Sequence, residues 1–222
     1  MMSPEHPPPR TRLRDVWAAE WKDRSFRVQA ILTAICLPAV LRTLAKFLNG
    51  VEERHGVILP DPFLDLFPAV DVNWLTFVII YGGLFVGILL LLKHPRNLLL
   101  AVQTYILMVL FRIVAMSLVP LDPPMGTIDL RDPFVQYLGT GRMLTRDLFF
   151  SGHTSTLFLI GLSMPVRRLR VLYYCCALAV AACVLLQHAH YSIDVFAAPF
   201  FAYGAYRVIS LMHRRLLQKP PQ

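Results

Sequence analysis

The stretch WLTFVIIYGGLFVGILLLL, from Trp74 to Leu92, decides the fold class of this chain. It runs for 19 residues without an Asp, Glu, Lys or Arg. At a helical rise of 1.5 Å per residue, such a segment is about 28 Å long, which matches the roughly 30 Å hydrocarbon core of a bilayer. The stretch therefore predicts a transmembrane helix.

Five further apolar runs of similar length accompany it along the chain. The earliest carries Arg42 and Lys46 near its end, where both side chains could extend to the lipid headgroups. Together the runs predict an all-α, polytopic membrane protein built as a bundle of six transmembrane helices. The five runs are Phe26–Leu48, Leu98–Val119, Leu148–Val166, Leu169–Leu186 and Ile193–Met212.

The composition of the 222 residues supports this class. Hydrophobic residues make up 56% and charged residues only 16%, against about 25% charged in an ordinary soluble domain. A soluble enzyme is therefore excluded, and the net charge of +8 is too scattered for a nucleic-acid partner. We expect one transmembrane catalytic domain over 26–212 and a basic tail over 213–222. The Pro-containing basic segment 1–25 could form an interfacial helix or only a flexible leader that sets the topology.

The distribution of basic residues predicts the orientation. Fourteen of the 22 Lys and Arg residues fall on one side of the predicted bundle, and the opposite connections are rich in acidic residues. By the positive-inside rule, both termini are expected to be cytoplasmic. The fourteen are Arg10, Arg12, Arg14, Lys22, Arg24, Arg27, Lys93, Arg96, Arg167, Arg168, Arg170, Arg214, Arg215 and Lys219.

Four ionisable residues in or beside the predicted spans are candidates for chemistry, because such groups are costly in a membrane. They are His153, His190, Asp194 and Arg112. The topology places His153 and the His190–Asp194 pair on the same, outer face. The i, i+4 spacing of the pair would bring both side chains together on a helix, so that Asp194 could orient the imidazole of His190.

This set could transfer a phosphoryl-type group. His190 would attack, His153 would protonate the leaving group, and Arg112 could hold a phosphate through its two-pronged guanidinium. Other interpretations remain open: the His–Asp pair can be structural, Ser151 can serve only as a helix cap, and Arg112 can pair with a carboxylate such as Asp122. A zinc set that also includes His188 would need an extended segment at that residue.

Four segments, in order, resemble the motifs of the sphingomyelin synthase-related family, which is similar to the type-2 phosphatidic acid phosphatase superfamily. The third and fourth carry the most specific matches, because they contain the two histidines and Asp194. The segments are Leu59–Asp65, Phe111–Pro120, Arg146–Thr154 and His190–Val195.

The resemblance implies a six-helix bundle with cytoplasmic termini and a catalytic triad of His153, His190 and Asp194 on the outer, periplasmic or lumenal, face. It also implies substrate contacts from matched motif residues, here Arg112, Asp147, Ser151 and Tyr191. The implied reaction moves phosphocholine or phosphoethanolamine from a glycerophospholipid to ceramide and releases diacylglycerol. It proceeds through a phosphohistidine, with no metal or other cofactor, and its partners are the lipid substrates and the bilayer.

Some positions depart from the family pattern. Thr145 and Arg146 stand where Cys and Gly commonly precede Asp147, and the second predicted span has no acidic residue. The choice between a choline and an ethanolamine donor, the identity of the acceptor and the oligomeric state therefore stay open. The alternatives are a phospholipase C-like hydrolase or a lipid phosphate phosphatase that uses the same His-His-Asp site with water as acceptor.

Overall fold

The computed structural model describes residues 12–132, 141 and 143–217. Within these residues the secondary structure is helical, with one isolated bridge between Val57 and Leu121 and no strand. The predicted all-α class is confirmed. The helices are α1 (Leu13–Lys22), α2 (Arg24–Glu53), the 3₁₀ turn η1 (Leu64–Leu66), α3 (Asn73–Leu91), α4 (Pro95–Leu118), α5 (Gly152–Ser163), α6 (Arg167–Leu186) and α7 (Ser192–Leu217).

Five of these helices are long and apolar enough to cross a membrane: α2, α3, α4, α6 and α7. Their outward faces carry large apolar side chains, among them Ile35, Phe85, Leu178 and Phe200, each more than 60% exposed. A soluble protein would not leave so many such side chains in water, whereas lipid chains solvate them. The chain is therefore an integral membrane protein.

The fourth predicted span differs from the prediction. The run Leu148–Val166 contains only the 12-residue helix α5, about 18 Å long and too short to cross a bilayer. The helix ends at Ser163 because Pro165 cannot continue it and restricts the residue before it. Before the helix, Phe150 and Ser151 are fully buried, so the chain enters the bundle before α5 begins. The run is apolar because α5 is surrounded by protein, and the count of six transmembrane helices is not established.

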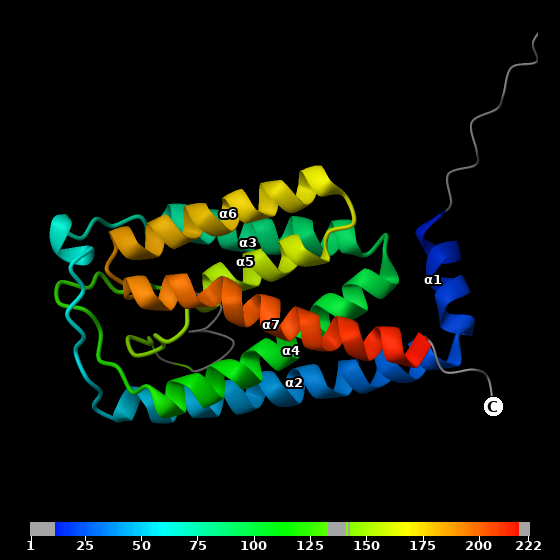
Figure 1. Cartoon of the computed structure of the whole chain (residues 1–222), viewed down its shortest axis with the longest axis horizontal. Helices are drawn as coiled ribbons and strands as arrows, with labels where there is room; N and C mark the ends of the chain where they lie inside the picture. Colours follow the sequence, from blue (N-terminus) through cyan, green and yellow to red (C-terminus); the bar gives the residue numbers. More distant parts are fainter. Residues whose placement is uncertain (1–11, 133–140, 142, 218–222) are drawn as a thin grey trace, which may run out of the picture.

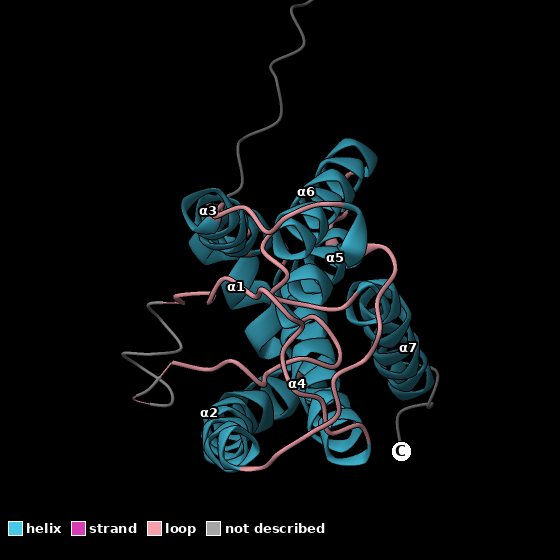
Figure 2. Ribbon diagram, turned by 90° about the vertical axis from the view of Figure 1, so that its left-hand side faces the viewer, coloured by secondary structure: helices cyan, strands magenta, loops and turns pink. Residues whose placement is uncertain are grey.

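The short helix α5 lies near the middle of the bundle, with α3, α4, α6 and α7 around it (Figure 2). Small residues on its neighbours allow this close packing. A Cβ atom added to Gly83 or Gly87 of α3 would come within 3 Å of α5 side chains. On α7, the fully buried Ala198, Ala202 and Ala205 follow helical spacing along one face.

The first helix, α1, lies across one end of the bundle, the end at which the described part of α7 also finishes (Figure 1). The Trp17 indole donates to the Leu92 carbonyl at 2.9 Å. Arg96 at the start of α4 pairs with Glu20 at 2.7 Å and with Asp23 at 2.8 Å. The basic N-terminal segment therefore includes a helix that is fixed to the bundle.

Candidate active site

The end of the bundle opposite α1 carries the long connections, and there two distant segments are joined directly. The backbone N–H of Ser151, just before α5, donates to the carbonyl of Asp194 in the first turn of α7 at 3.1 Å. Figure 2 looks onto this end, where the loops cross the ends of the helices. One hydrogen bond thus connects the Ser-Gly-His segment to the His-Tyr-Ser-Ile-Asp segment.

His190 and Asp194 form a buried pair. The His190 Nδ1 atom lies 3.2 Å from Asp194 Oδ2, and the residues are 3% and 0% exposed. His190 precedes α7 rather than lying on it. The backbone N–H of the next residue, Tyr191, donates to the same oxygen, Asp194 Oδ2, at 3.0 Å, and this second bond holds the carboxylate beside His190. This carboxylate fixes the imidazole and leaves its Nε2 as the nitrogen that can react.

His153, the second residue of α5, has a carboxylate partner that the sequence did not suggest. Its Nε2 atom lies 3.1 Å from Asp132 Oδ2, and Asp132 also accepts a hydrogen bond from the Tyr81 hydroxyl of α3. The His153 ring also makes a T-shaped contact with Phe77 of α3. Each of the two candidate histidines is therefore held by its own aspartate.

A small polar cavity of about 50 Å³ brings the two histidines together. We call it the polar cavity. Its described lining comes from the loop segments before α5 and α7 and from the start of α5. The lining residues are Thr127, Asp129, Leu130, Asp132, Met143, Leu144, Thr145, Asp147, His153, Ala189 and His190.

Arg112 reaches the same site from α4. Its guanidinium is buried and donates from Nη2 to Asp147 Oδ1 at 2.5 Å, while its Nε has no hydrogen-bond partner among the described residues. A Cβ on Gly152 would come within 2.9 Å of Arg112 Cζ and closer still to Nη1, so the guanidinium lies against the start of α5. Arg112 is thus positioned beside His153 by Asp147 and by the missing side chain of Gly152.

Asp122, considered above as a partner of Arg112, is instead bound by Arg146, whose Nε donates to Asp122 Oδ1 at 2.6 Å. This bond holds the pKa of Asp122 below its usual value. Because the pKa is depressed, the contribution of the pair to stability is present above the unfolded-state value of about 3.9 and is lost as the pH falls through the folded-state pKa. Glu52, at the end of α2, accepts hydrogen bonds from the backbone N–H groups of Thr145 and Arg146. The bonds from Asp122 and Glu52 to Arg146 and Thr145 fix the segment that leads into the site.

The other predicted substrate contacts have structural partners. Ser151 is fully buried and makes no capping hydrogen bond to the α5 backbone; its hydroxyl donates to Thr154 Oγ1 at 3.1 Å. The Tyr191 hydroxyl donates to the Asp122 carbonyl and accepts from the Leu59 N–H, so it ties two loops together. Neither residue lines the polar cavity.

The first motif segment also has a structural position. Asp61 accepts hydrogen bonds from the backbone N–H and the hydroxyl of Ser192, at 2.6 and 3.1 Å, and so holds the start of α7. The ring of His188 is directed toward Met125 and Phe67. The backbone φ of His188 is +52°, so this residue is not extended. Among the described residues, there is no group of three or more His, Cys, Asp or Glu side chains that could hold a metal ion.

A larger cavity of about 630 Å³ opens from the site into the bundle between α2, α3 and α4. We call it the α2–α4 cavity. Arg112, Asp132, Asp147 and His153 lie in its wall, and most of the remaining lining is apolar. The remaining residues are Pro38, Leu41, Arg42, Leu44, Ala45, Leu48, Ile80, Tyr81, Leu84, Tyr105, Met108, Val109, Gly152 and Thr156.

Comparison with family models gives an independent finding. Residues 146–211 match the model described as PAP2 superfamily C-terminal. A comparison with curated proteins found no match. The matched segment includes His153, His190 and Asp194, and the match supports the type-2 phosphatidic acid phosphatase superfamily. It thereby indicates a membrane enzyme that acts on phosphoesters of lipids.

Proposed function

We propose that this chain transfers the phosphorylated head group of a glycerophospholipid to the hydroxyl of ceramide and releases diacylglycerol. The observation that carries the proposal is the site itself. Two histidines, each bound to an aspartate, meet at one polar cavity, and one of them also lies in the wall of an apolar cavity that contains a buried arginine. A lipid phosphoester needs this combination of nucleophile, proton donor, phosphate ligand and space for acyl chains.

In the first step, His190 Nε2 attacks the phosphorus and the bond between phosphorus and the diacylglycerol oxygen breaks. His153 donates a proton to that oxygen, which gives neutral diacylglycerol and a phosphohistidine at His190. Asp194, at 3.2 Å from Nδ1, stabilises the positive charge that develops on the ring. Arg112 binds the phosphate oxygens and offsets the charge of the transferred group.

In the second step, His153 accepts the proton of the acceptor hydroxyl, and the resulting oxygen attacks the phosphorus. The bond between phosphorus and His190 Nε2 breaks, which returns both histidines to their starting states. Asp132 keeps the His153 ring oriented in both steps through its contact with Nε2, so that Nδ1 can exchange the proton.

The donor fits the α2–α4 cavity. Its acyl chains would lie against the apolar side chains of α2 and α4, and its phosphate would lie at the end that carries Arg112. Arg112 would then share its guanidinium between Asp147 and the phosphate, which a five-donor group can do. Asp147 serves as a positioning group for Arg112, and the hydrogen bonds of Ser151 and Tyr191 also hold the surrounding segments.

The superfamily match favours one alternative, because phosphatases resolve the same intermediate with water. In that case the enzyme is a phospholipase C-like hydrolase or a lipid phosphate phosphatase. Both the transferase and the hydrolase share the first step, so only the acceptor separates them.

The test uses purified protein in detergent with labelled phosphatidylcholine or phosphatidylethanolamine, with and without ceramide. We expect diacylglycerol and the phosphorylated ceramide in equal amounts when ceramide is present. Release of free phosphocholine or phosphoethanolamine whether or not ceramide is added would establish the hydrolase. In a parallel reaction with phosphatidic acid as the substrate, release of inorganic phosphate, with the intact phospholipids unused, would establish the phosphatase.

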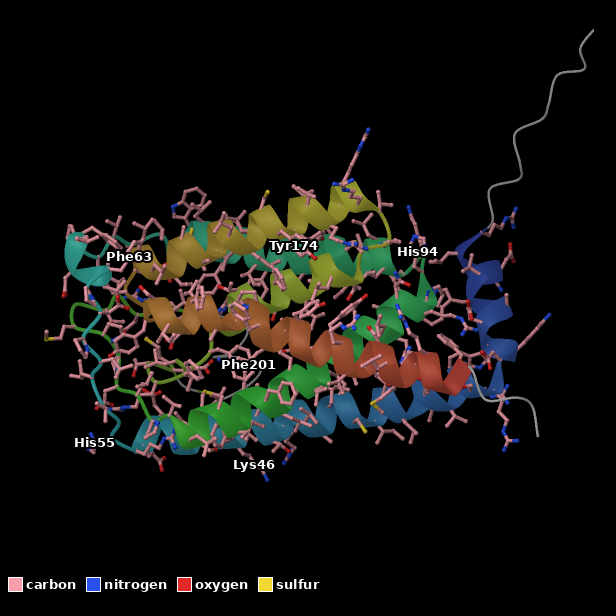
Figure 3. The ribbon with its side chains drawn as sticks, viewed as in Figure 1. Lys46, His55, Phe63, His94, Tyr174 and Phe201 are labelled. Carbon is pink, nitrogen blue, oxygen red and sulfur yellow. The ribbon has the colours of Figure 1, made fainter. Side chains whose placement is uncertain are left out.

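We also propose that both termini are cytoplasmic and that the site opens to the outer face, because 14 of the 22 Lys and Arg residues fall on the side of α1 and the start of α4, whereas the connections around the site are rich in acidic residues. The exposed His55 and His94 lie at opposite ends of the bundle (Figure 3). In a variant in which the four cysteines are replaced by alanine, a membrane-impermeant thiol reagent should label His55→Cys and not His94→Cys in intact cells or spheroplasts. The reverse pattern would contradict the orientation.

A further inference from the structure

We propose that a second apolar cavity, between α5, α6 and α7, binds the acceptor, and that this acceptor is an uncharged lipid with a free hydroxyl group. We call it the α5–α7 cavity; its volume is about 900 Å³. The inference rests on the proposed transferase and adds where the second substrate binds. The lining residues are Leu59, Pro60, Asp61, Pro62, Phe63, Thr154, Phe158, Tyr174, Ala177, Leu178, Ala181, Leu185, Tyr191, Ser192, Ile193, Val195, Phe196, Pro199 and Phe200.

The α5–α7 cavity extends from the loop end of the bundle along α6. Figure 3 shows Phe63 at the loop end and Tyr174 farther along toward the opposite end. Its apolar side chains include Leu178, Phe196 and Phe200, which are 72%, 66% and 63% exposed and so belong to the lipid-facing surface. A lipid can therefore enter from the bilayer without crossing water.

Helix α5 separates this cavity from the α2–α4 cavity. Thr154 and Phe158 line the α5–α7 cavity, whereas Gly152 and Thr156 line the α2–α4 cavity. Positions two apart on a helix differ by about 200° in direction, so the two pairs lie on opposite faces of α5. The two cavities share no lining residue among those described, and they can hold two lipids at the same time.

The charges of the two cavities differ in a way that assigns the two substrates. Arg42 and Arg112 lie in the wall of the α2–α4 cavity, where a phosphate can be bound. The described lining of the α5–α7 cavity contains no Lys, Arg or His, and its one carboxylate, Asp61, already binds Ser192. A phosphate buried beside that carboxylate would have no positive group to neutralise its own negative charge, which is costly. An uncharged lipid has no such cost.

The lining of the α5–α7 cavity includes the chain neighbours of both candidate histidines. Thr154 directly follows His153 in the chain, and Tyr191 directly follows His190. Thr154 is linked to the buried Ser151 by a hydroxyl–hydroxyl hydrogen bond of 3.1 Å. A lipid hydroxyl can exchange into this bond, which would bring it beside His153, the group that must accept its proton.

The test measures the two half-reactions separately in variants that fill one cavity or the other. Ala181→Phe narrows the α5–α7 cavity, and Ala45→Phe narrows the α2–α4 cavity. With the phospholipid alone, the burst of diacylglycerol measures the donor step. The formation of phosphorylated ceramide after ceramide is added measures the acceptor step. We expect Ala181→Phe to raise the KM for ceramide about 10-fold or more with the burst retained, and Ala45→Phe to reduce the burst.

Two further variants complete the design. Leu172 is exposed on α6, the helix that also carries Ala181, and it lines neither cavity. The control variant Leu172→Phe should therefore leave both steps unchanged. If Ala181→Phe does not fold, Leu178→Trp, at an exposed position in the same lining, is used instead. Two results in Ala181→Phe, or in Leu178→Trp where that variant is used, would overturn the assignment. They are an unchanged KM for ceramide and a diacylglycerol burst reduced as much as in Ala45→Phe. Failure of the proposed function is distinguishable, because then the wild-type protein itself would show no burst or no dependence on ceramide.

Discussion

Head-group transfer by His190→Ala is expected to fall by about 10⁴-fold or more, because the variant lacks the atom that forms the bond to phosphorus. His190 is buried, and its Nδ1 is bound to Asp194, so only Nε2 can act as the nucleophile. His153 does not duplicate this position, because its ring belongs to α5 and is bound to Asp132. The measurement is the initial rate of diacylglycerol release from labelled phospholipid.

The matched control for this loss is His55→Ala, an exposed histidine on a loop at the same end of the bundle. It should retain wild-type activity, and both variants should elute as the wild type does in size-exclusion chromatography. Wild-type protein given donor without acceptor should also carry the head-group phosphate on His190 in mass spectrometry of its peptides. A modification on His153 instead would reverse the roles assigned to the two histidines.

Gly152→Ala is expected to lower the rate of transfer by about 10²-fold with little change in thermal stability. The added methyl group would collide with the Arg112 guanidinium, which is buried and cannot move without a change in its bond to Asp147. A displacement of about 1 Å in a group that positions substrate can cost this factor in rate. Alanine is favourable within a helix, and the atoms that it meets are the far end of a flexible side chain that can shift, so the fold is not expected to suffer.

Gly204→Ala on α7 provides the control, because a Cβ at that position meets no atom within 4 Å. It should show wild-type rate and donor affinity. If Gly152→Ala is as active as this control, Arg112 does not hold the transferred phosphate, and its buried pair with Asp147 is structural.

The sequence predicted the helices well where the helices face lipid. The observed α3, Asn73–Leu91, differs from the predicted Trp74–Leu92 by one residue at each end. Long apolar runs are a strong signal because a bilayer demands a fixed length. The contact between His190 and Asp194 was predicted from the i, i+4 spacing on a helix. It forms although His190 precedes α7, because the chain already turns there, with the Asp194 N–H donating to the Tyr191 carbonyl at 3.0 Å.

The sequence could not predict features that depend on distant contacts. Asp132 lies in a connection, 21 residues before His153, and nothing in its surroundings distinguishes it from Asp129 or Asp122. The partner of Arg112 was open for the same reason, because Asp122 and Asp147 precede and follow the same long connection. The length of α5 was overestimated because an apolar run reads the same whether lipid or protein surrounds it.

The shortness of α5 has an electrostatic consequence. The first N–H groups of a helix carry a partial positive charge, and a helix that spanned the whole bilayer would present them to the water and headgroups at the surface. Helix α5 begins instead at Gly152, after the fully buried Phe150 and Ser151, so its positive end lies in a low-dielectric interior beside Arg112. Charge interactions are several times stronger in such surroundings than in water. A helix too short to cross the membrane thus supplies a buried electropositive end beside Arg112, where the phosphoryl group of the proposed reaction would gain negative charge.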